Sequence, residues 1–238
     1  MCSLKIVELD TVGSTNDHAR RLAEEGAVSG TVVWAHEQTA GRGRQGNSWA
    51  SPPGNLYMSM ILRPRTNSTH VGQLSFLSAV ALANVLETIL PETAKITLKW
   101  PNDLLINRKK AAGILLETES RGANPSWVVI GIGVNVATAP EKAISLHDVG
   151  VKDCEPVDVL EPLAREILSL AGQWEEEGFD PIRKAWLTRS CKPGEPLTAR
   201  LPKETLMGTF DGLDHTGALL LTLADGRRRV IASGEVFA

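Results

Sequence analysis

The chain has 238 residues, of which 42% are hydrophobic, and this is enough for one substantial core or a core with a small satellite. Its 25 basic and 28 acidic residues give a net charge of -3, so no overall field attracts nucleic acid or lipid. The three scattered cysteines, the strand-like N-terminus and the short apolar stretches argue against a disulfide framework, export and a membrane span, and they predict a cytoplasmic protein.

The first quarter of the chain predicts a strand, a helix, a second strand and a long loop. Residues 4–8 predict the first strand, and Ser14 has the spacing of an N-cap for a helix over residues 14–25. A buried strand over residues 31–36 leads into a glycine-rich loop from 38 to 54. Long loops without secondary structure are often functional, so this loop is the first place to expect chemistry.

The middle of the chain predicts a core helix among several strands. Helical spacing runs over residues 71–90, and two later helices are predicted over residues 157–176 and 181–188. The predicted strands cover residues 56–62, 96–99, 104–106, 112–117 and 127–136.

The pattern changes near residues 192–194. Short strands at tight spacing follow, over residues 196–200, 206–210, 218–223 and 228–232. They predict a small β-barrel that depends on the larger unit for stability. The predicted domains are residues 1–190 and 191–238.

Segment 41–46 has the Gly-x-Gly-x-x-Gly spacing of dinucleotide-binding folds. That motif requires a helix directly after it and an acidic residue about twenty positions further on. Segment 47–53 cannot continue as a regular helix, and no acidic residue occurs between Glu37 and Glu87. The context therefore excludes this class of nucleotide site.

The same acid-free interval carries Arg42, Arg44, Arg63 and Arg65. Glycines beside Arg42 allow backbone amides to approach a ligand, and arginine binds phosphate or carboxylate through paired hydrogen bonds. The interval predicts an anion-binding loop. Composition alone explains a solvated basic loop that touches RNA equally well.

Further candidates lie at predicted strand ends. Segments 99–103 and 110–117 place lysines where an ammonium can neutralise charge as a phosphoryl or acyl bond breaks, whereas Lys109 is predicted to be exposed at a hairpin turn. Segment 131–136 combines two glycines with an asparagine, which allows close backbone approach. Core filling is favoured over ligand contact for Trp100. The sequence contains no phosphate-binding P-loop, zinc-protease or hydrolase motif.

Five segments, taken in order, resemble the biotin protein ligase family. They are residues 14–16, 38–46, 99–103, 110–117 and 131–135. Each is weak alone, but their order and spacing are specific. The resemblance implies an α+β fold, with a mixed β-sheet backed by helices, like class II aminoacyl-tRNA synthetases and biotin ligases, and a small C-terminal SH3-like β-barrel. It also implies a ligase without the DNA-binding domain that repressor members carry, and hence no DNA partner.

The resemblance implies an ATP-dependent, AMP-forming enzyme. Such an enzyme converts biotin to biotinyl adenylate and transfers biotin to a lysine of the biotin carboxyl carrier protein of acetyl-CoA carboxylase. Biotin and ATP are the implied substrates, with Mg²⁺ accompanying the nucleotide and no metal-binding side chain assigned. The carrier is the implied partner, no membrane is involved, and a homodimer is compatible with the family.

Roles follow from the resemblance position by position. Arg44 and Lys110 are the implied catalytic residues, facing the biotin carboxylate and the α-phosphate. The implied biotin-binding residues are Ser14, Thr15, Asn16, Gln38, Gly41, Arg42, Gly43, Arg44, Lys110 and Gly113. The implied nucleotide-binding residues are Arg44, Trp49, Trp100, Asn102 and Asn135. Residues 137–151 contain no counterpart of the tryptophan that stacks on adenine in some members, which leaves adenine packing undefined.

Two alternatives remain open from the sequence. A lipoate ligase or octanoyl transferase is similar in fold and also acylates a carrier lysine, although the complete Gly-Arg-Gly-Arg loop and the Lys-Trp-Pro-Asn-Asp segment favour biotin. The second alternative, from another class, is a non-enzymatic RNA-binding module that uses the Arg-Gly loop.

Overall fold

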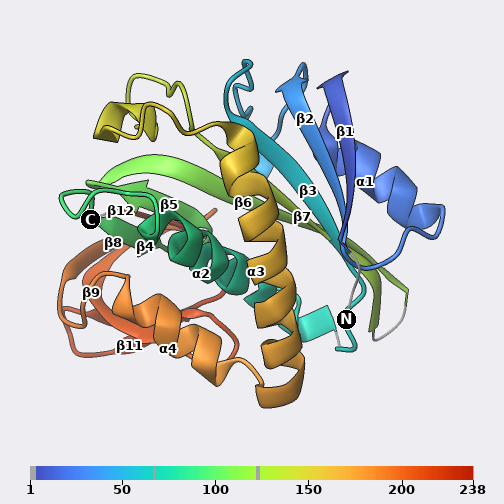
Figure 1. Ribbon diagram of the computed structural model, residues 1–238. Coiled ribbons are helices and arrows are strands. Elements are labelled where there is room, and N and C mark those ends of the chain that lie inside the picture. Colours follow the sequence, from blue (N-terminus) through green and yellow to red (C-terminus); the bar gives the residue numbers. More distant parts are fainter. Residues whose placement is uncertain (1–3, 67, 122–123, 238) are drawn as a thin grey trace.

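A computed structural model describes residues 4–66, 68–121 and 124–237, which form two sheets and four α-helices (Figure 1). The larger sheet has the strand order β1-β2-β3-β7-β6-β5-β4. Only the β1 and β2 pair is parallel within it, so the predicted mixed sheet is confirmed. Its strands are β1 (Lys5–Val12), β2 (Thr31–Gln38), β3 (Leu56–Leu62), β4 (Ile96–Lys99), β5 (Asp103–Ile106), β6 (Lys109–Arg121) and β7 (Asn124–Val134).

Helices cover both faces of the central strands. Side chains alternate between the two faces of a strand, and here those on both faces are apolar and packed against helices. Val33, Ile61 and Val129 pack with helix α1 (Thr15–Glu24) in one apolar cluster. Their neighbours Val32 and Met60 belong to the main core on the opposite face. That face carries α2 (Gln73–Glu87), α3 (Pro156–Glu177) and α4 (Asp180–Thr188).

Helix α2 lies at the centre of the main core. All but two of its residues are buried, since the sheet lies on one side of it and α3 and α4 on the other (Figure 1). A helix that is apolar all round needs such an enclosed position. The predicted core helix is thus confirmed, although it is shorter than the predicted range of 71–90.

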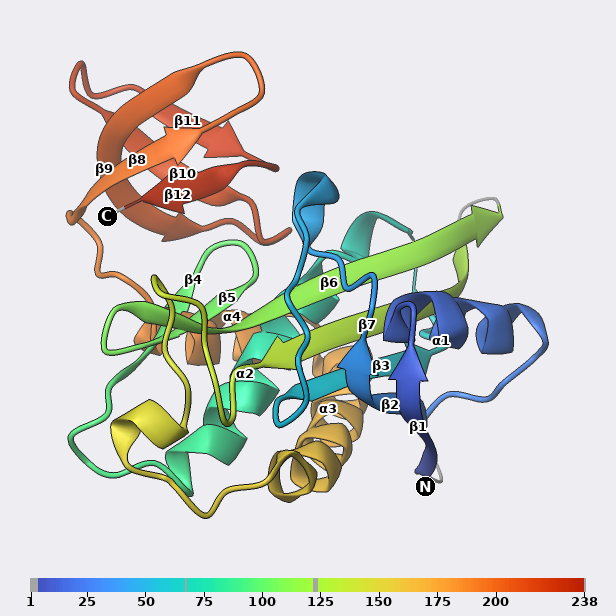
Figure 2. The same ribbon diagram turned by 90° about the horizontal axis from the view of Figure 1, so that it is seen from above.

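The smaller sheet is antiparallel and curls into a barrel beside the larger one (Figure 2). Its order is β11-β10-β9-β8-β12, which includes a last strand that the sequence pattern did not predict. Its strands are β8 (Pro196–Arg200), β9 (Thr205–Leu213), β10 (Leu219–Leu223), β11 (Arg228–Ile231) and β12 (Glu235–Phe237). The predicted boundary after residue 190 falls between α4 and β8.

Within the described residues, no helix has both the length and the apolar character that a membrane crossing requires.

Candidate functional site

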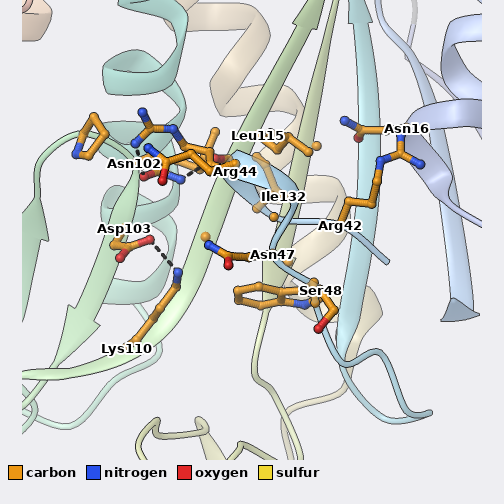
Figure 3. A pocket seen from close by; sticks show the side chains of 18 of the residues that line it. Asn16, Arg42, Arg44, Asn47, Ser48, Asn102, Asp103, Lys110, Leu115 and Ile132 are labelled. Carbon is orange, nitrogen blue, oxygen red and sulfur yellow. Dashed lines mark hydrogen bonds and ion pairs between the residues drawn. The ribbon is translucent and has the colours of Figure 1, made fainter. Parts of the chain in front are cut away.

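A pocket lies over the start of β6 and the end of β7, and residues 42–45 and 47–49 of the loop between β2 and β3 form part of its lining (Figure 3). The ribbon of this loop runs beside β6 and β7 (Figure 2). The pocket brings together most of the predicted site residues. Those in its lining are Ser14, Thr15, Asn16, Gln38, Arg42, Gly43, Arg44, Trp49, Trp100, Asn102, Lys110 and Gly113.

One end of the pocket is a network of neutral polar side chains. The backbone N–H of Thr15 donates to Oε1 of Gln38 at 2.8 Å, and Oγ1 of Thr15 donates to the same oxygen at 3.0 Å. Oγ of Ser59 lies 2.6 Å from Oδ1 of Asn16, while Nδ2 of Asn16 is buried and has no partner. An unpaired buried donor is costly, so this end of the pocket suits a ligand that offers an acceptor.

Ser14 occupies the N-cap position of α1, as predicted, but its side chain makes no capping hydrogen bond. The N-cap spacing therefore predicted where the helix starts, although the Ser14 side chain does not cap it. Asp17, three positions further on, pairs with Arg42. The Ser14 hydroxyl is buried and lines the pocket, where it remains available to a ligand.

The side chain of Arg44 extends from the loop toward Asn102 (Figure 3). Its Nη1 donates to Oδ1 of Asn102 at 3.2 Å and to the carbonyl oxygen of Gly234 at 3.4 Å. Burial lowers the pKa of Arg44, while the nearby carboxylates of Asp103 and Glu235 raise it. The guanidinium still stays charged at physiological pH, and its low-dielectric surroundings strengthen its attraction for an anion.

Lys110 points into the pocket from the start of β6. Its side chain is directed toward Asp103 (Figure 3). Nζ lies 2.7 Å from Oδ1 of Asp103 and 5.2 Å from the centre of the Trp49 ring. Lys99 lies 3.8 Å from the same carboxylate. Two ammonium groups thus share one carboxylate, so positive charge is in excess at this end of the pocket.

Trp49 lies close against two glycines of the sheet. A Cβ atom at Gly113 would come within 3.0 Å of the indole ring, and one at Gly133 within 2.6 Å. Nε1 of Trp49 is buried without a partner. The indole therefore occupies a space that exists only because both strand positions are glycines.

The structure corrects the prediction that the arginines of the acid-free interval together form an anion site. Arg42 donates two hydrogen bonds to Asp17, at 2.6 and 2.8 Å, and one to Glu117 at 3.3 Å, which point its side chain away from Lys110 (Figure 3). Arg63 donates to backbone carbonyls outside the pocket. Asp17 and Glu117, which are distant in sequence, neutralise Arg42. Among the described residues, Arg44 has only neutral hydrogen-bond partners, so its charge remains available to an anion in the pocket.

Two predicted residues, Gly41 and Asn135, lie outside the pocket lining. A Cβ at Gly41 would meet Oγ of Ser51 at 2.5 Å, so this glycine allows the loop to pack on itself. The Asn135 side chain donates to the carbonyl oxygens of Lys110 and Ile144, at 3.4 and 3.2 Å, and therefore supports the strand that carries Lys110.

Trp100 fills core, as favoured. It is buried, and its Nε1 donates to the carbonyl oxygen of Gly217 in the smaller sheet at 3.1 Å. Lys109 is exposed next to the turn before β6, which also agrees with the prediction.

Sequence reasoning missed Glu235 and Val236, which line the pocket from β12. It also gave no role to Asn47, Ser48 and Met58. No motif marks these residues, and those of β12 come from the far end of the chain, so only the docking of the two sheets shows that they belong to the site. Among the described residues, no group of three or more His, Cys, Asp or Glu side chains could hold a metal ion.

Comparisons with known proteins find relatives along most of the chain. Residues 9–135 match the biotin/lipoate A/B protein ligase family, and residues 194–238 match the biotin protein ligase C terminal domain. The chain is 40% identical to a biotin–[acetyl-CoA-carboxylase] ligase of Paracoccus denitrificans, over 94% of this chain and 96% of that protein. It is 34% identical to a bifunctional ligase/repressor of Bacillus subtilis, over 94% of this chain and 71% of that protein.

A solved structure extends the likeness to three dimensions. The biotin protein ligase of Aquifex aeolicus, in complex with biotin and ATP, superposes with a TM-score of 0.83 at 29% identity. The match covers 98% of this chain and 97% of that one.

Proposed function

The chain belongs to the biotin/lipoate A/B protein ligase family, and from this membership we propose how its pocket divides the work of a biotin ligase. It is a ligase that activates biotin with ATP and attaches it to a carrier protein. The observation that supports our assignment most directly is the arrangement of the pocket, with neutral polar groups at one end and Arg44, Lys99 and Lys110 at the other. The lipoate and RNA-binding alternatives are not favoured.

The neutral polar end binds the ureido ring of biotin. A urea has fixed donors and acceptors, and matched polar groups discriminate strongly for such a ligand. Nδ2 of Asn16 lacks a partner and the hydroxyl of Ser14 is not used as a cap, so both are available to it. Gln38, which already accepts two hydrogen bonds from Thr15, fixes the position of these groups.

Arg44 and Lys110 act on the reacting groups. In the first step a carboxylate oxygen of biotin attacks the α-phosphorus of ATP, and the bond from that phosphorus to the bridging oxygen breaks, which releases pyrophosphate. Negative charge accumulates on the phosphoryl oxygens, and the two cations stabilise it while holding the reactants in line. Lys110 exchanges its present partner Asp103 for these oxygens.

The nucleotide lies over Trp49, at the end of the pocket near Lys110. Asn102 supports this region indirectly, because its Oδ1 accepts from Arg44 and its Nδ2 donates to the Ile114 carbonyl oxygen at 2.7 Å. Asn102 and Asn135 are therefore positioning residues for Arg44 and Lys110 respectively.

Mg²⁺ would arrive with the triphosphate. In nucleotide sites this ion keeps several waters and takes phosphate oxygens with one or two carboxylates, and Asp103 and Glu235 are the carboxylates in the pocket lining. Its charge would offset the charge of the departing pyrophosphate.

Removal of the metal tests this role of Mg²⁺. Chelation with EDTA should abolish pyrophosphate exchange, and added Mg²⁺ should restore it. Full exchange activity in EDTA would refute the role of Mg²⁺.

We further propose that the acceptor is the biotin carboxyl carrier protein of acetyl-CoA carboxylase, since relatives of this chain are named for that substrate. Labelling of a whole-cell extract with biotin should identify the acceptor, and light scattering should test whether the enzyme forms a homodimer.

We also propose that the enzyme acts in the cytoplasm. Cys154 and Cys191 are free thiols, which is consistent with a reducing compartment, while Cys2 lies outside the described residues.

The experiment that tests the proposed function measures biotin-dependent exchange of pyrophosphate into ATP. Lys110→Ala should reduce this exchange by about 100-fold or more, in line with the loss of one preorganised charge-stabilising donor. The adjacent Lys109→Ala is a matched control, because Lys109 is exposed and outside the pocket lining, and it should behave as the wild type. No exchange in the wild type would refute the function, and normal exchange in Lys110→Ala would refute the role of Lys110.

A further inference from the structure

A second groove adjoins the ligand pocket and lies between the two sheets. Its volume is about 330 Å³, within the range of roughly 300–1,000 Å³ that is usual for small-ligand sites. Residues 69–76 before and within α2 form one wall, residues 114–116 of β6 another, and residues 216–218 with Ala232 of the smaller sheet the third.

The groove lies where β5 no longer pairs with β6. β5 pairs with β6 only as far as Gly113, and Asn102 makes the last hydrogen bonds to this edge, at Ile114, so β5 does not cover β6 beyond that residue. Trp100 and Gln73 hold the smaller sheet across this opening, because their side chains donate to the carbonyl oxygens of Gly217 and His215 at 3.1 Å each. The walls are therefore fixed by hydrogen bonds between the two sheets.

The groove and the ligand pocket meet at Arg44. Both are lined by Arg44, by residues 100–102 and by Ile114 and Leu115. Because the proposed function places the biotin carboxylate at Arg44, the groove leads directly to the carbon that carries the activated acyl group.

We propose that this groove admits the acceptor lysine of the carrier protein to the acyl carbon of biotinyl adenylate. The inference rests on the proposed function and adds the route of the second substrate. In this step the lysine amine attacks the acyl carbon, an amide C–N bond forms, and the C–O bond to the phosphate breaks. AMP leaves with that electron pair, and the amine gives its extra proton to solvent.

The chemistry of the walls suits a lysine that must react as a neutral amine. Arg44 is the one charged residue among those that line the groove, and apolar groups such as Phe76, Ile114 and Leu116 make up much of the rest. Desolvation and a neighbouring cation both disfavour an ammonium, so they lower the pKa of an entering lysine. At the junction, the carbonyl oxygens of Pro101 and of the Asn102 side chain can accept the amine N–H groups.

Ala232 gives a direct test, because it is exposed and lines the groove without lining the ligand pocket. The substitution Ala232→Trp should obstruct the groove. Pyrophosphate exchange should stay within about twofold of the wild type, while transfer to the carrier should fall at least about tenfold. Hydroxylamine, a nucleophile small enough to pass the obstruction, should consume enzyme-bound adenylate at the wild-type rate.

Ser233→Trp is the matched control, since Ser233 is the next residue, is also exposed and lines neither the groove nor the ligand pocket. It should leave exchange and transfer unchanged. Ala232→Leu, a smaller obstruction, should show the same separation of the two half-reactions to a lesser degree, and normal exchange in either variant shows that the protein is folded.

Normal carrier labelling by Ala232→Trp would overturn the proposal, and so would an equal loss of exchange and transfer in both Ala232 variants. Neither result would contradict the proposed ligase function. That proposal is refuted only if the wild type shows no biotin-dependent exchange of pyrophosphate.

Discussion

Arg42 holds the glycine-rich loop to two other elements through its side chain. Its guanidinium lies within 3.3 Å of Glu117 on β6 and makes a paired interaction with Asp17 on α1. The hydrogen bond from Arg42 is the main cause of the lowered pKa of Asp17. The side chain thus holds the loop in position against α1 and β6.

We predict that Asp17→Asn raises the KM for biotin by about threefold to fivefold with little change in kcat. The side chains of Arg42 and Asp17 are 37% and 42% exposed, so solvent screens their ion pair. The pair therefore contributes no more than about 1 kcal/mol to the stability of the loop. Steady-state exchange kinetics measure the effect. As a control, Glu161→Gln breaks a similar ion pair with Arg165 on the surface of α3 and should change neither constant.

The pKa of Asp17 also predicts how the effect of Asp17→Asn on the KM for biotin varies with pH. Because the pKa of Asp17 is depressed in the folded chain, its contribution is present above the usual value of 3.8 and is lost only as the pH falls below it. The ratio of mutant to wild-type KM should therefore stay constant between about pH 6 and 8. A ratio that varies across this range would show that another group controls the loop.

At the scale of elements, β7 carries two glycines that serve different parts of the pocket. A Cβ at Gly131 would lie 2.1 Å from Oδ1 of Asn16, whereas one at Gly133 would lie 2.6 Å from the Trp49 ring. The two positions face the same side of the strand, since they are two residues apart. One strand therefore sets the space beside Asn16, where we propose that biotin binds, and beside Trp49, where we propose that the nucleotide binds.

We predict that Gly131→Ala and Gly133→Ala have separable effects. Gly131→Ala displaces the Asn16 amide and should raise the KM for biotin about tenfold, which corresponds to about 1.4 kcal/mol of binding. Gly133→Ala displaces Trp49 and should raise the KM for ATP by a similar factor. Equal effects of each variant on both constants would contradict the division of the pocket.

A third glycine controls for the general cost of an added methyl group. Gly172 lies inside α3, and a Cβ there would meet nothing within 4 Å. Gly172→Ala should therefore raise the melting temperature, by the equivalent of about 0.5–1 kcal/mol, and leave both KM values unchanged.

The elements themselves were largely predictable, because apolar periodicity reports which face of a strand or helix is buried. The helix over residues 73–87 and the buried strand over residues 56–62 follow from this local signal. Partners of charged side chains were not predictable. Asp17 and Glu117 lie 25 and 75 residues from Arg42, so only the fold shows that these acids neutralise this arginine of the acid-free interval. β12 was missed because three residues carry too little periodicity.

At the scale of the whole molecule, the two sheets share one core. Leu197, Phe210 and Leu219 of the smaller sheet belong to the same apolar cluster as α2 and α4. Gly217 has a φ of 91°, and a Cβ there would lie 2.7 Å from the Phe76 ring, so the turn between β9 and β10 fits closely against α2. Such contact leaves no separate core for each unit.

We predict that the full chain unfolds in a single calorimetric transition and that residues 191–238 do not fold alone. A segment of this size cannot bury enough apolar surface, and the larger unit covers the apolar residues that it would expose. Gly217→Ala should lower the one melting temperature, because an alanine is strained at this φ and clashes with Phe76. Two resolved transitions, or dispersed amide resonances from the isolated segment, would show that the sheets are independent and that the groove between them can open and close.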